Sequence, residues 1–250
     1  MLSKAQAKQI RALHRKKNRQ DEGLFLVEGE KIVVELLRSD WRIHSLFATP
    51  TFLEEYKALV HDRGVDAFEC DAEALTKTGT LRSNNAALAV VHMAPEDSSA
   101  PTGWTLALED INDPGNLGAI LRIADWYGFS DVMCSPQTVE LYNPKVIAAS
   151  KGSFLRVRVH YRALDGYFET LPQGTDVFGA YLDGESVHTL RLASGQGVVL
   201  MGSEAHGISD TLAPYVTRRI TIPSFGNAES LNVGIATAII CDNLRRLQDT

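Results

Sequence analysis

The fold of this chain is decided at ITIPSFGNAESLNVGIATAIICDNLRRL, residues 220–247. The spacing predicts a short strand that ends at Pro223, a polar loop, and a long apolar helix opened by Ser230-Leu231-Asn232. Ser230 is a good N-cap by itself, so capping explains that residue, whereas Asn232 within the first turn is harder to explain as a cap. One face of the helix suits packing against the core or against a second copy; it carries Val233, Ala236, Ile240 and Leu244.

Strands alternate with helices throughout the C-terminal two-thirds of the chain. We expect strands at 105–109, 131–134, 157–160, 176–180, 197–201 and 218–221, and helices at 116–127, 144–150, 164–171 and 230–247. This alternation is typical of an α/β fold with a mostly parallel sheet covered on both faces. Ligands of such sheets bind beyond the carboxyl ends of the strands, so the loops that leave strands are the candidate sites.

A second, smaller α/β/α module precedes this part. Its expected strands are 24–27, 43–48, 65–69 and 86–92, with helices at 29–38 and 52–60. The segment MAPEDSSAPTGW, residues 93–104, is rich in Pro, Ser and acid and has no apolar periodicity. We therefore expect an N-terminal domain over 1–93, a linker over 94–104 and a C-terminal domain over 105–250.

The composition is that of a globular protein, with 44% hydrophobic and 22% charged residues. No apolar run approaches the roughly 18 residues of a membrane span, and the N-terminus lacks the apolar region of a signal peptide. Cys70, Cys134 and Cys241 are scattered and odd in number, which argues against a disulfide framework or a zinc site. We expect a cytoplasmic protein with no metal.

Positive charge is concentrated at the N-terminus, although the net charge of the chain is −6. Residues 1–19 hold seven Lys or Arg and no acid. Such a segment suits a polyanion such as RNA, and it equally suits a solvated helix face. The RNA-binding candidates are Lys8, Arg11, Arg15, Lys16, Lys17 and Arg19.

Two more strand-end loops carry polar residues. In LEDINDPGNLGAILRIADWYG, residues 108–128, Asn116 lies at a helix start and Arg122 is a cation in an otherwise apolar stretch. If buried, Arg122 needs a partner, which is either a phosphate or one of the carboxylates Glu109, Asp110 and Asp125. In VVLMGSEAHGIS, residues 198–209, Gly202 ends a buried strand and permits close approach of a ligand, and Glu204 follows it.

Taken together, the three loops resemble the SpoU (TrmH) branch of the SPOUT RNA methyltransferases. The resemblance covers about residues 106–247, and IP…ESLNV is its most specific part. The segment FLVEGEKIVVELL, residues 25–37, resembles more weakly the ribosomal-protein-like substrate-binding domain that often precedes such enzymes.

This resemblance implies a deep C-terminal trefoil knot, S-adenosylmethionine bound bent within it, and a homodimer that acts on structured RNA. The knot would be an exception to the rule that chains are not knotted. The cofactor contacts carried over are Ala180, Leu200, Met201, Gly202, Ile222 and Leu231, mainly through backbone groups. The catalytic residues carried over are Asn116, Arg122, Glu204, Ser230 and Asn232.

The reaction implied is methylation of a ribose 2′-hydroxyl. We expect the substrate to be ribosomal RNA, with transfer RNA as the alternative. A guanidinium stays protonated at neutral pH and is a poor base, so we expect Arg122 to grip the adjacent phosphate and to align the hydroxyl. Glu204 would orient Arg122 or the substrate. The alternatives are a SPOUT enzyme that methylates a base, an RNA-binding protein without activity, and a small-molecule enzyme on a doubly wound sheet.

Overall fold

A computed structural model describes residues 2–95, 101, 103–192 and 195–248. The chain folds into two compact units. Unit 1 comprises residues 1–95 and 140–155, and unit 2 comprises residues 96–139 and 156–250. Most of the expected linker, residues 96–100 and 102, lies outside the described residues. The segment 140–155, which the sequence division assigns to the C-terminal domain, packs as part of unit 1.

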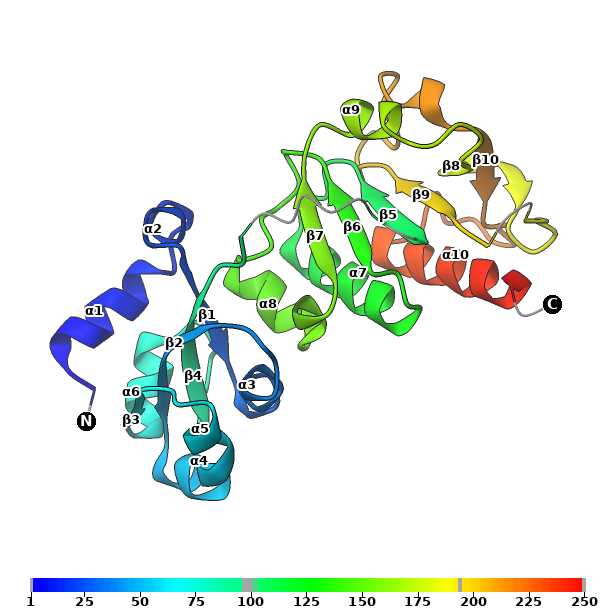
Figure 1. Cartoon of the computed structure of the whole chain (residues 1–250). Coiled ribbons are helices and arrows are strands. Elements are labelled where there is room, and N and C mark those ends of the chain that lie inside the picture. Colours follow the sequence, from blue (N-terminus) through cyan, green and yellow to red (C-terminus); the bar gives the residue numbers. More distant parts are fainter. Residues whose placement is uncertain (1, 96–100, 102, 193–194, 249–250) are drawn as a thin grey trace. The chain divides into compact units, whose positions relative to one another are not determined.

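Unit 1 is built on a four-stranded mixed sheet of order β1-β4-β2-β3 (Figure 1). The strands are β1 (Leu24–Glu28), β2 (Ile43–Ala48), β3 (Ala67–Glu69) and β4 (Ala87–His92). The helices of its N-terminal stretch are α1 (Lys4–Ala12), α2 (Lys16–Glu22), α3 (Glu30–Leu37), α4 (Pro50–Glu55), α5 (Lys57–Asp62) and α6 (Ala72–Thr78). The helix expected over 52–60 is in fact two short helices, because the backbone of Tyr56 leaves the helical region between them.

The basic N-terminal segment is folded. Ser3 and Gln6 form a reciprocal capping box at the start of α1, and Ile10 and Leu13 are buried against the sheet. The segment 140–155 adds α8 (Pro144–Ser150) and the short 3-10 helix Ser153–Leu155 to the same unit. Phe154 packs its ring edge-on against Phe25 of β1, with 5.9 Å between the ring centroids.

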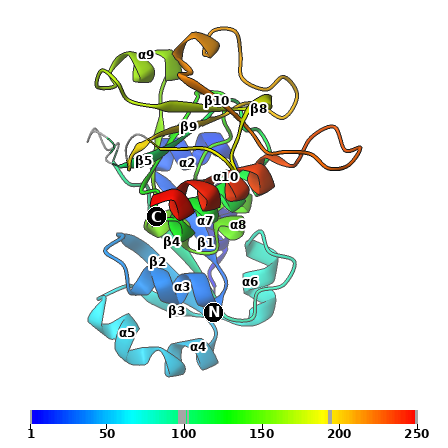
Figure 2. The same ribbon diagram turned by 90° about the vertical axis from the view of Figure 1, so that its right-hand side faces the viewer.

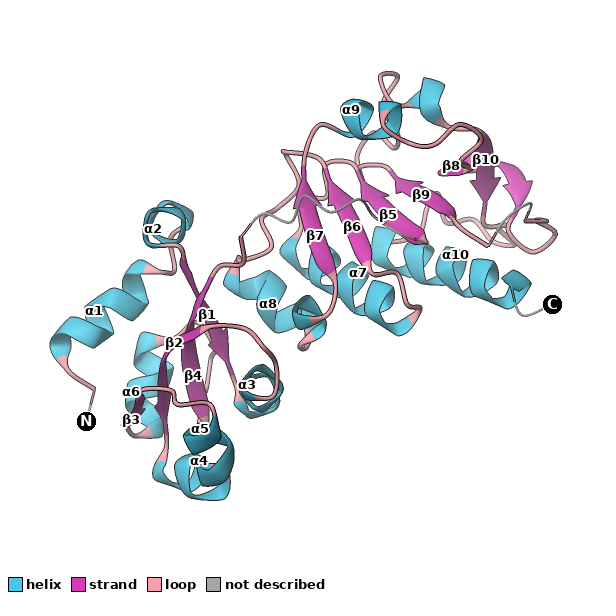
Figure 3. Ribbon diagram, in the orientation of Figure 1, coloured by secondary structure: helices cyan, strands magenta, loops and turns pink. Residues whose placement is uncertain are grey.

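Unit 2 contains a six-stranded sheet of order β10-β8-β9-β5-β6-β7 in which every pair is parallel (Figure 3). Its strands are β5 (Trp104–Leu108), β6 (Asp131–Cys134), β7 (Arg158–Tyr161), β8 (Val177–Ser186), β9 (Gly197–Met201) and β10 (Arg218–Thr221). Its helices are α7 (Pro114–Trp126), α9 (Leu164–Glu169) and α10 (Val233–Gln248), with the 3-10 turn Ala213–Tyr215. The expected α/β fold with a parallel sheet is confirmed.

Helix α10 packs along α7 (Figure 2). The helix face that the sequence suggested for packing against the core or against a second copy lies in the core of unit 2, since Val233, Ile240 and Leu244 are buried. The exposed apolar side chain of α10 is Ile235, which is 54% exposed, and Trp126 at the end of α7 is 82% exposed. No described helix is long and apolar enough to cross a membrane.

Candidate functional site

Strand order determines which loops meet in unit 2. Strands β5 and β9 are neighbours, so the loops after them, 109–113 and 202–209, begin at the same edge of the sheet. Strand β10 lies beyond β8, and the chain that follows it returns across the sheet to start α10 beside α7. The three loops singled out in the sequence therefore converge at the carboxyl edge, where ligands of parallel sheets bind.

A line of hydrogen bonds joins these loops. The side-chain amide of Asn116 donates to a carboxylate oxygen of Glu204, and the amide of Asn232 donates to the side-chain oxygen of Asn116 at 3.0 Å. The oxygen of Asn232 accepts the backbone N–H groups of Gly234 (3.0 Å) and Ile235 (3.3 Å). One candidate catalytic residue from each loop is thus held in a single polar chain.

Asp113 and Asn232 are the residues that cap the two helices at the site. Asp113 caps α7, since its carboxylate accepts the backbone N–H of Asn116 at 2.9 Å, which leaves the Asn116 side chain for Glu204. Helix α10 begins at Val233, so Asn232 caps it and Ser230 does not. The N-cap role predicted for Ser230 is wrong, because the chain becomes helical only three residues later. Ser230 is exposed in a loop.

Arg122 lies on α7 and is exposed. Its guanidinium makes no hydrogen bond or ion pair with any other described residue. The carboxylates proposed as structural partners are engaged elsewhere: Asp125 pairs with Arg156 at 2.8 Å, Glu109 accepts the backbone N–H of Ser209 at 2.9 Å, and Asp110 accepts from Ser135 at 2.7 Å. Arg122 is therefore available for a ligand.

Glu109 and Asp110 instead brace the loop that leads into α7. Glu109 ties it to the loop that carries Glu204. Asp110 has a positive φ of 54°, a strained conformation for a residue other than glycine, and two hydrogen bonds with Ser135 hold it there. These bracing residues gave no recognisable signal in the sequence beyond their position after a strand.

The cofactor candidates occupy the same edge in different ways. Leu200 and Met201 are buried in β9, so their side chains pack in the core, and the carbonyl oxygen of Met201 accepts the backbone N–H of Glu109 at 2.9 Å. Ala180 is half-buried. Ile222 and Leu231 flank the loop after β10, and their backbone groups make no hydrogen bond with another described residue. Open backbone donors and acceptors at this edge can receive a polar ligand.

The structure gives a reason for glycine at position 202 that the sequence did not indicate. A Cβ at this position would lie 2.1 Å from the carbonyl carbon of Gly207 and 2.3 Å from the backbone nitrogen of Ile208. Ser203 and Gly207 exchange two backbone hydrogen bonds, of 3.0 and 2.9 Å, that close this loop. Glycine therefore permits the loop that presents Glu204 to fold back on the strand end.

The RNA-binding candidates fall into two groups. Lys8, Arg11, Arg15, Lys16 and Lys17 are exposed on α1, α2 and the turn between them. Arg19 is 2% exposed; its guanidinium donates to the backbone oxygens of Leu13 (2.8 Å) and His14 (2.9 Å) and pairs with Glu140. The prediction that Arg19 binds RNA is wrong, because intramolecular acceptors hold this side chain in the interior of unit 1.

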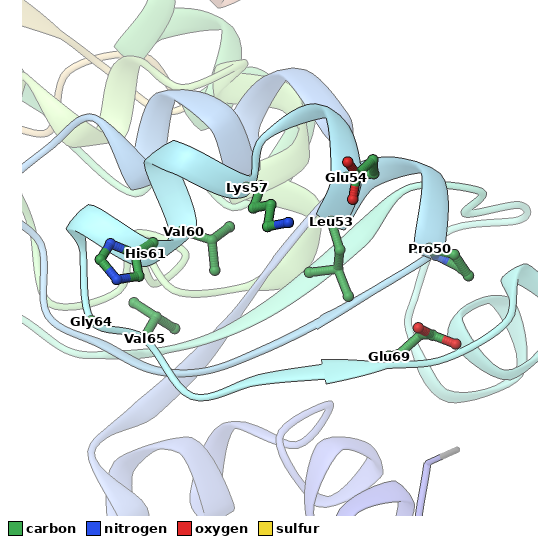
Figure 4. A pocket seen from close by; sticks show the side chains of 9 residues that line it. All are labelled: Pro50, Leu53, Glu54, Lys57, Val60, His61, Gly64, Val65 and Glu69. Carbon is green, nitrogen blue, oxygen red and sulfur yellow. The ribbon is translucent and has the colours of Figure 1, made fainter.

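A shallow groove of about 640 Å³ lies between α4, α5 and β3 (Figure 4). Leu53, Val60 and Val65 line it together with Lys57 and Glu69. It belongs to unit 1 and contains none of the candidate catalytic residues. Within the described residues, no group of three or more His, Cys, Asp or Glu side chains could hold a metal ion.

Comparison with known proteins agrees with this geometry. Residues 103–242 match the SpoU rRNA methylase family, and residues 4–89 match the MRM3-like substrate-binding domain. The chain is 29% identical to a 23S rRNA (guanosine-2′-O)-methyltransferase, RlmP, of Bacillus subtilis, over 95% of each chain.

Solved structures are similar over nearly the whole chain. A protein of Porphyromonas gingivalis assigned to the TrmH family of RNA methyltransferases has a TM-score of 0.85 and 35% identity, over 98% of this chain and 99% of its own. The AdoMet-bound rRNA methyltransferase of Sinorhizobium meliloti has a TM-score of 0.88 and 27% identity, over 98% and 97%.

Proposed function

Since this chain belongs to the SpoU rRNA methylase family, we propose that it transfers the methyl group of S-adenosylmethionine to a ribose 2′-hydroxyl of structured RNA. The observation that carries this proposal is the line Glu204–Asn116–Asn232, which joins all three family motifs through side-chain hydrogen bonds. Arg122, exposed and without a partner among the described residues, supplies a free cation on the same helix as Asn116.

The carboxyl edge suits S-adenosylmethionine. The open backbone groups of Ile222 and Leu231 offer donors and acceptors for a nucleoside. The apolar side chains of the same two residues are only partly buried and offer surface for the adenine ring. When bound, the cofactor supplies an electrophilic methyl group on its sulfonium. We assign its contacts to Ala180, Leu200, Met201, Gly202, Ile222 and Leu231.

The catalytic residues would position the ribose. Arg122 grips the phosphate next to the target nucleotide through its guanidinium fork, which fixes the 2′-hydroxyl for attack. Asn116 holds one carboxylate oxygen of Glu204, so the other oxygen is available to the ribose or to Arg122. Ser230 and Asn232 complete the polar surroundings. As the new bond between the ribose oxygen and the methyl carbon forms, the proton of the hydroxyl leaves by way of the gripped phosphate to solvent, because a guanidinium is already protonated and does not accept it.

Ribosomal RNA is the substrate class that we favour, with transfer RNA as the alternative. The relative from Bacillus subtilis and the one from Sinorhizobium meliloti are both named as rRNA methyltransferases, and each is matched over nearly its full length. The match of residues 4–89 to a substrate-binding domain supports an N-terminal domain that recognises RNA. We propose residues 1–93 as the RNA-recognition domain and residues 105–250 as the methyltransferase domain, with 94–104 as the linker; residues 140–155 of the latter pack with unit 1.

We also propose the family's knot and a homodimer. The return of the chain from β10 to α10 supports a knotted C-terminus. The dimer is supported by Trp126 and Ile235, exposed apolar side chains on α7 and α10, two helices that pack together. Three buried free cysteines agree with the reducing cytoplasm as the compartment.

A direct assay tests the proposed function. The protein is incubated with labelled S-adenosylmethionine and total RNA, and the labelled nucleotide is then mapped. Label on a ribose, retained after the base is removed, is the expected result. Label on a base would support the base-methylating alternative, and the absence of label from all RNA classes would support an RNA-binding protein without activity.

A further inference from the structure

Three basic side chains lie where the two central strands of the sheet of unit 1, β2 and β4, begin and end. Arg42 and His44 lie at the start of β2, and His92 is the last residue of β4. The two imidazole rings are 5.5 Å apart between centroids and nearly perpendicular, at 86°. The backbone N–H of His92 donates to the carbonyl oxygen of Arg42 at 3.0 Å, which fixes the strand ends side by side.

A β-bulge brings His44 to His92. Ile43 pairs with Val91 and Ser45 pairs with Val90, so His44 is the extra residue between two regular pairs. Such a bulge bends the strand and turns the extra side chain away from its regular direction. Arg42 and His44 are exposed and His92 is half-buried, so the three groups are open to solvent.

No carboxylate of the described residues pairs with these groups. None of the three side chains has a hydrogen bond or an ion pair with another described residue. The pKa of His92 is lowered, first by partial burial and then by the charges of Arg42 and His44; no acidic group is among the causes. A cluster that contains an arginine, two histidines and no counter-charge has the composition of an anion site.

We propose that Arg42, His44 and His92 bind a phosphate group of the RNA substrate. The inference rests on the proposed function for the identity of that substrate. The guanidinium of Arg42 is charged at every relevant pH and supplies a fork of donors. Each imidazole, once protonated, donates from a ring nitrogen, so the phosphate provides the negative charge that the cluster lacks.

Binding at this site takes up protons. A bound phosphate favours the protonated form of the imidazoles, so RNA affinity increases as the pH falls through the range in which they take up protons, and is constant outside that range. Histidine ordinarily titrates near ~6.5. We therefore expect RNA to bind roughly tenfold more tightly at pH 5.5 than at pH 7.5, the contribution of one charge-assisted hydrogen bond.

The test uses the full chain with two probes, inorganic phosphate and total ribosomal RNA. NMR follows the ring protons of His44 and His92, assigned from His44→Gln and His92→Gln, over pH 5–8. Either probe should raise the pKa of both rings by about half a unit or more. RNA affinity is then measured at both pH values for the wild type and the double variant H44Q/H92Q, which should lose most of the pH dependence.

The matched control is H61Q/H188Q, which removes two exposed histidines from other parts of the chain. It should keep the tenfold pH dependence. Equal pH dependence in H44Q/H92Q and the wild type, at unchanged melting temperature, would overturn the inference, and so would rings that respond to Zn²⁺ but to neither phosphate nor RNA. Methyl transfer is assayed separately: RNA that binds with the expected pH dependence but is never methylated would overturn the proposed function and leave the phosphate site standing.

Discussion

Asn232 donates a 3.0 Å hydrogen bond to the side-chain oxygen of Asn116, a residue 116 positions earlier in the chain. The direction of this bond is fixed at both ends. The oxygen of Asn232 is occupied by the backbone N–H groups of Gly234 and Ile235, so its amide nitrogen must face Asn116. The carboxylate of Glu204 accepts from Asn116, so the oxygen of Asn116 must face Asn232. The start of α10 thereby orients Glu204.

Asn232→Asp separates the capping role of this residue from its role in the site. An aspartate keeps the oxygen that caps α10, so we expect the melting temperature to change by no more than a few degrees. It cannot donate to Asn116, and it places a second negative charge near Glu204. The turnover number should fall by about tenfold to a hundredfold, measured with labelled cofactor at saturating RNA.

Asn232→Ala is the control for that substitution, because it removes both roles. It should lower turnover and also cost about 1 kcal/mol of stability through the lost cap. If Asn232→Asp were as active as the wild type, the side-chain line would not contribute to catalysis.

Arg122→Ala should abolish methyl transfer and leave cofactor affinity and stability nearly unchanged. The reason is that Arg122 is exposed and touches no partner among the described residues, so its truncation breaks nothing in the fold. Arg122→Lys should rescue poorly, since an ammonium keeps the charge but cannot make the fork. Calorimetry with S-adenosylmethionine checks the first point; cofactor affinity lost together with activity would make Arg122 a structural residue.

The sequence predicted what depends on local pattern and missed what depends on long-range contact. The hydrophobic periodicity and the residue composition were enough to predict the parallel sheet and the three loops at its carboxyl edge. They did not place the cap of α10 at Asn232, because Ser230 is an equally good cap by residue type. They also could not assign Arg19 to the interior, since Glu140, its carboxylate partner, is 121 positions away.

Asp131 makes the stability of unit 2 depend on pH. Burial alone would raise the pKa of Asp131, but hydrogen bonds from His160 (2.9 Å), Arg158 (2.8 and 2.7 Å) and Ser130 (2.8 Å) outweigh it and hold the pKa well below its usual value. A depressed carboxyl pKa adds stability above the unfolded pKa, near ~3.9, which is lost as the pH falls toward the folded pKa.

Asp131→Asn tests this relation. We expect the variant to be less stable than the wild type at pH 7, because the Arg158 guanidinium loses its carboxylate. The difference in urea-unfolding free energy should shrink as the pH falls below about 4, where the wild-type carboxylate begins to lose its advantage. A difference that stays constant from pH 7 to pH 3 would contradict the lowered pKa.

Ile235→Glu should convert the proposed dimer to a monomer. Ile235 lies on the exposed side of α10, and a buried, unpaired carboxylate at an interface is strongly unfavourable. Sedimentation at micromolar concentration measures the mass. Leu182→Glu is the matched control, since Leu182 is 80% exposed on β8, outside α7 and α10, and its substitution should leave the dimer intact. If the wild-type chain sedimented as a monomer, the proposed homodimer would be contradicted.

The exposed cations of α1 and α2 should supply RNA affinity without contributing to chemistry. Replacing Arg15, Lys16 and Lys17 with Ala removes up to three phosphate contacts. Each contact that is fully engaged should flatten the dependence of log affinity on log salt by roughly 0.7–0.9. Turnover at saturating RNA should change little, because the candidate catalytic residues belong to unit 2.

Arg19→Ala is the control that the structure provides, because it removes a cation from the same helix that is not exposed. It leaves Glu140 without its partner inside unit 1, so we expect a loss of roughly 3–5 kcal/mol in stability. Under conditions in which the variant is folded, its log RNA affinity should depend on log salt as steeply as that of the wild type. If log affinity depended on log salt equally in the triple variant and the wild type, the exposed cations would instead form a solvated helix face. The RNA backbone would then bind elsewhere, and Arg42, His44 and His92 would be the next group to test.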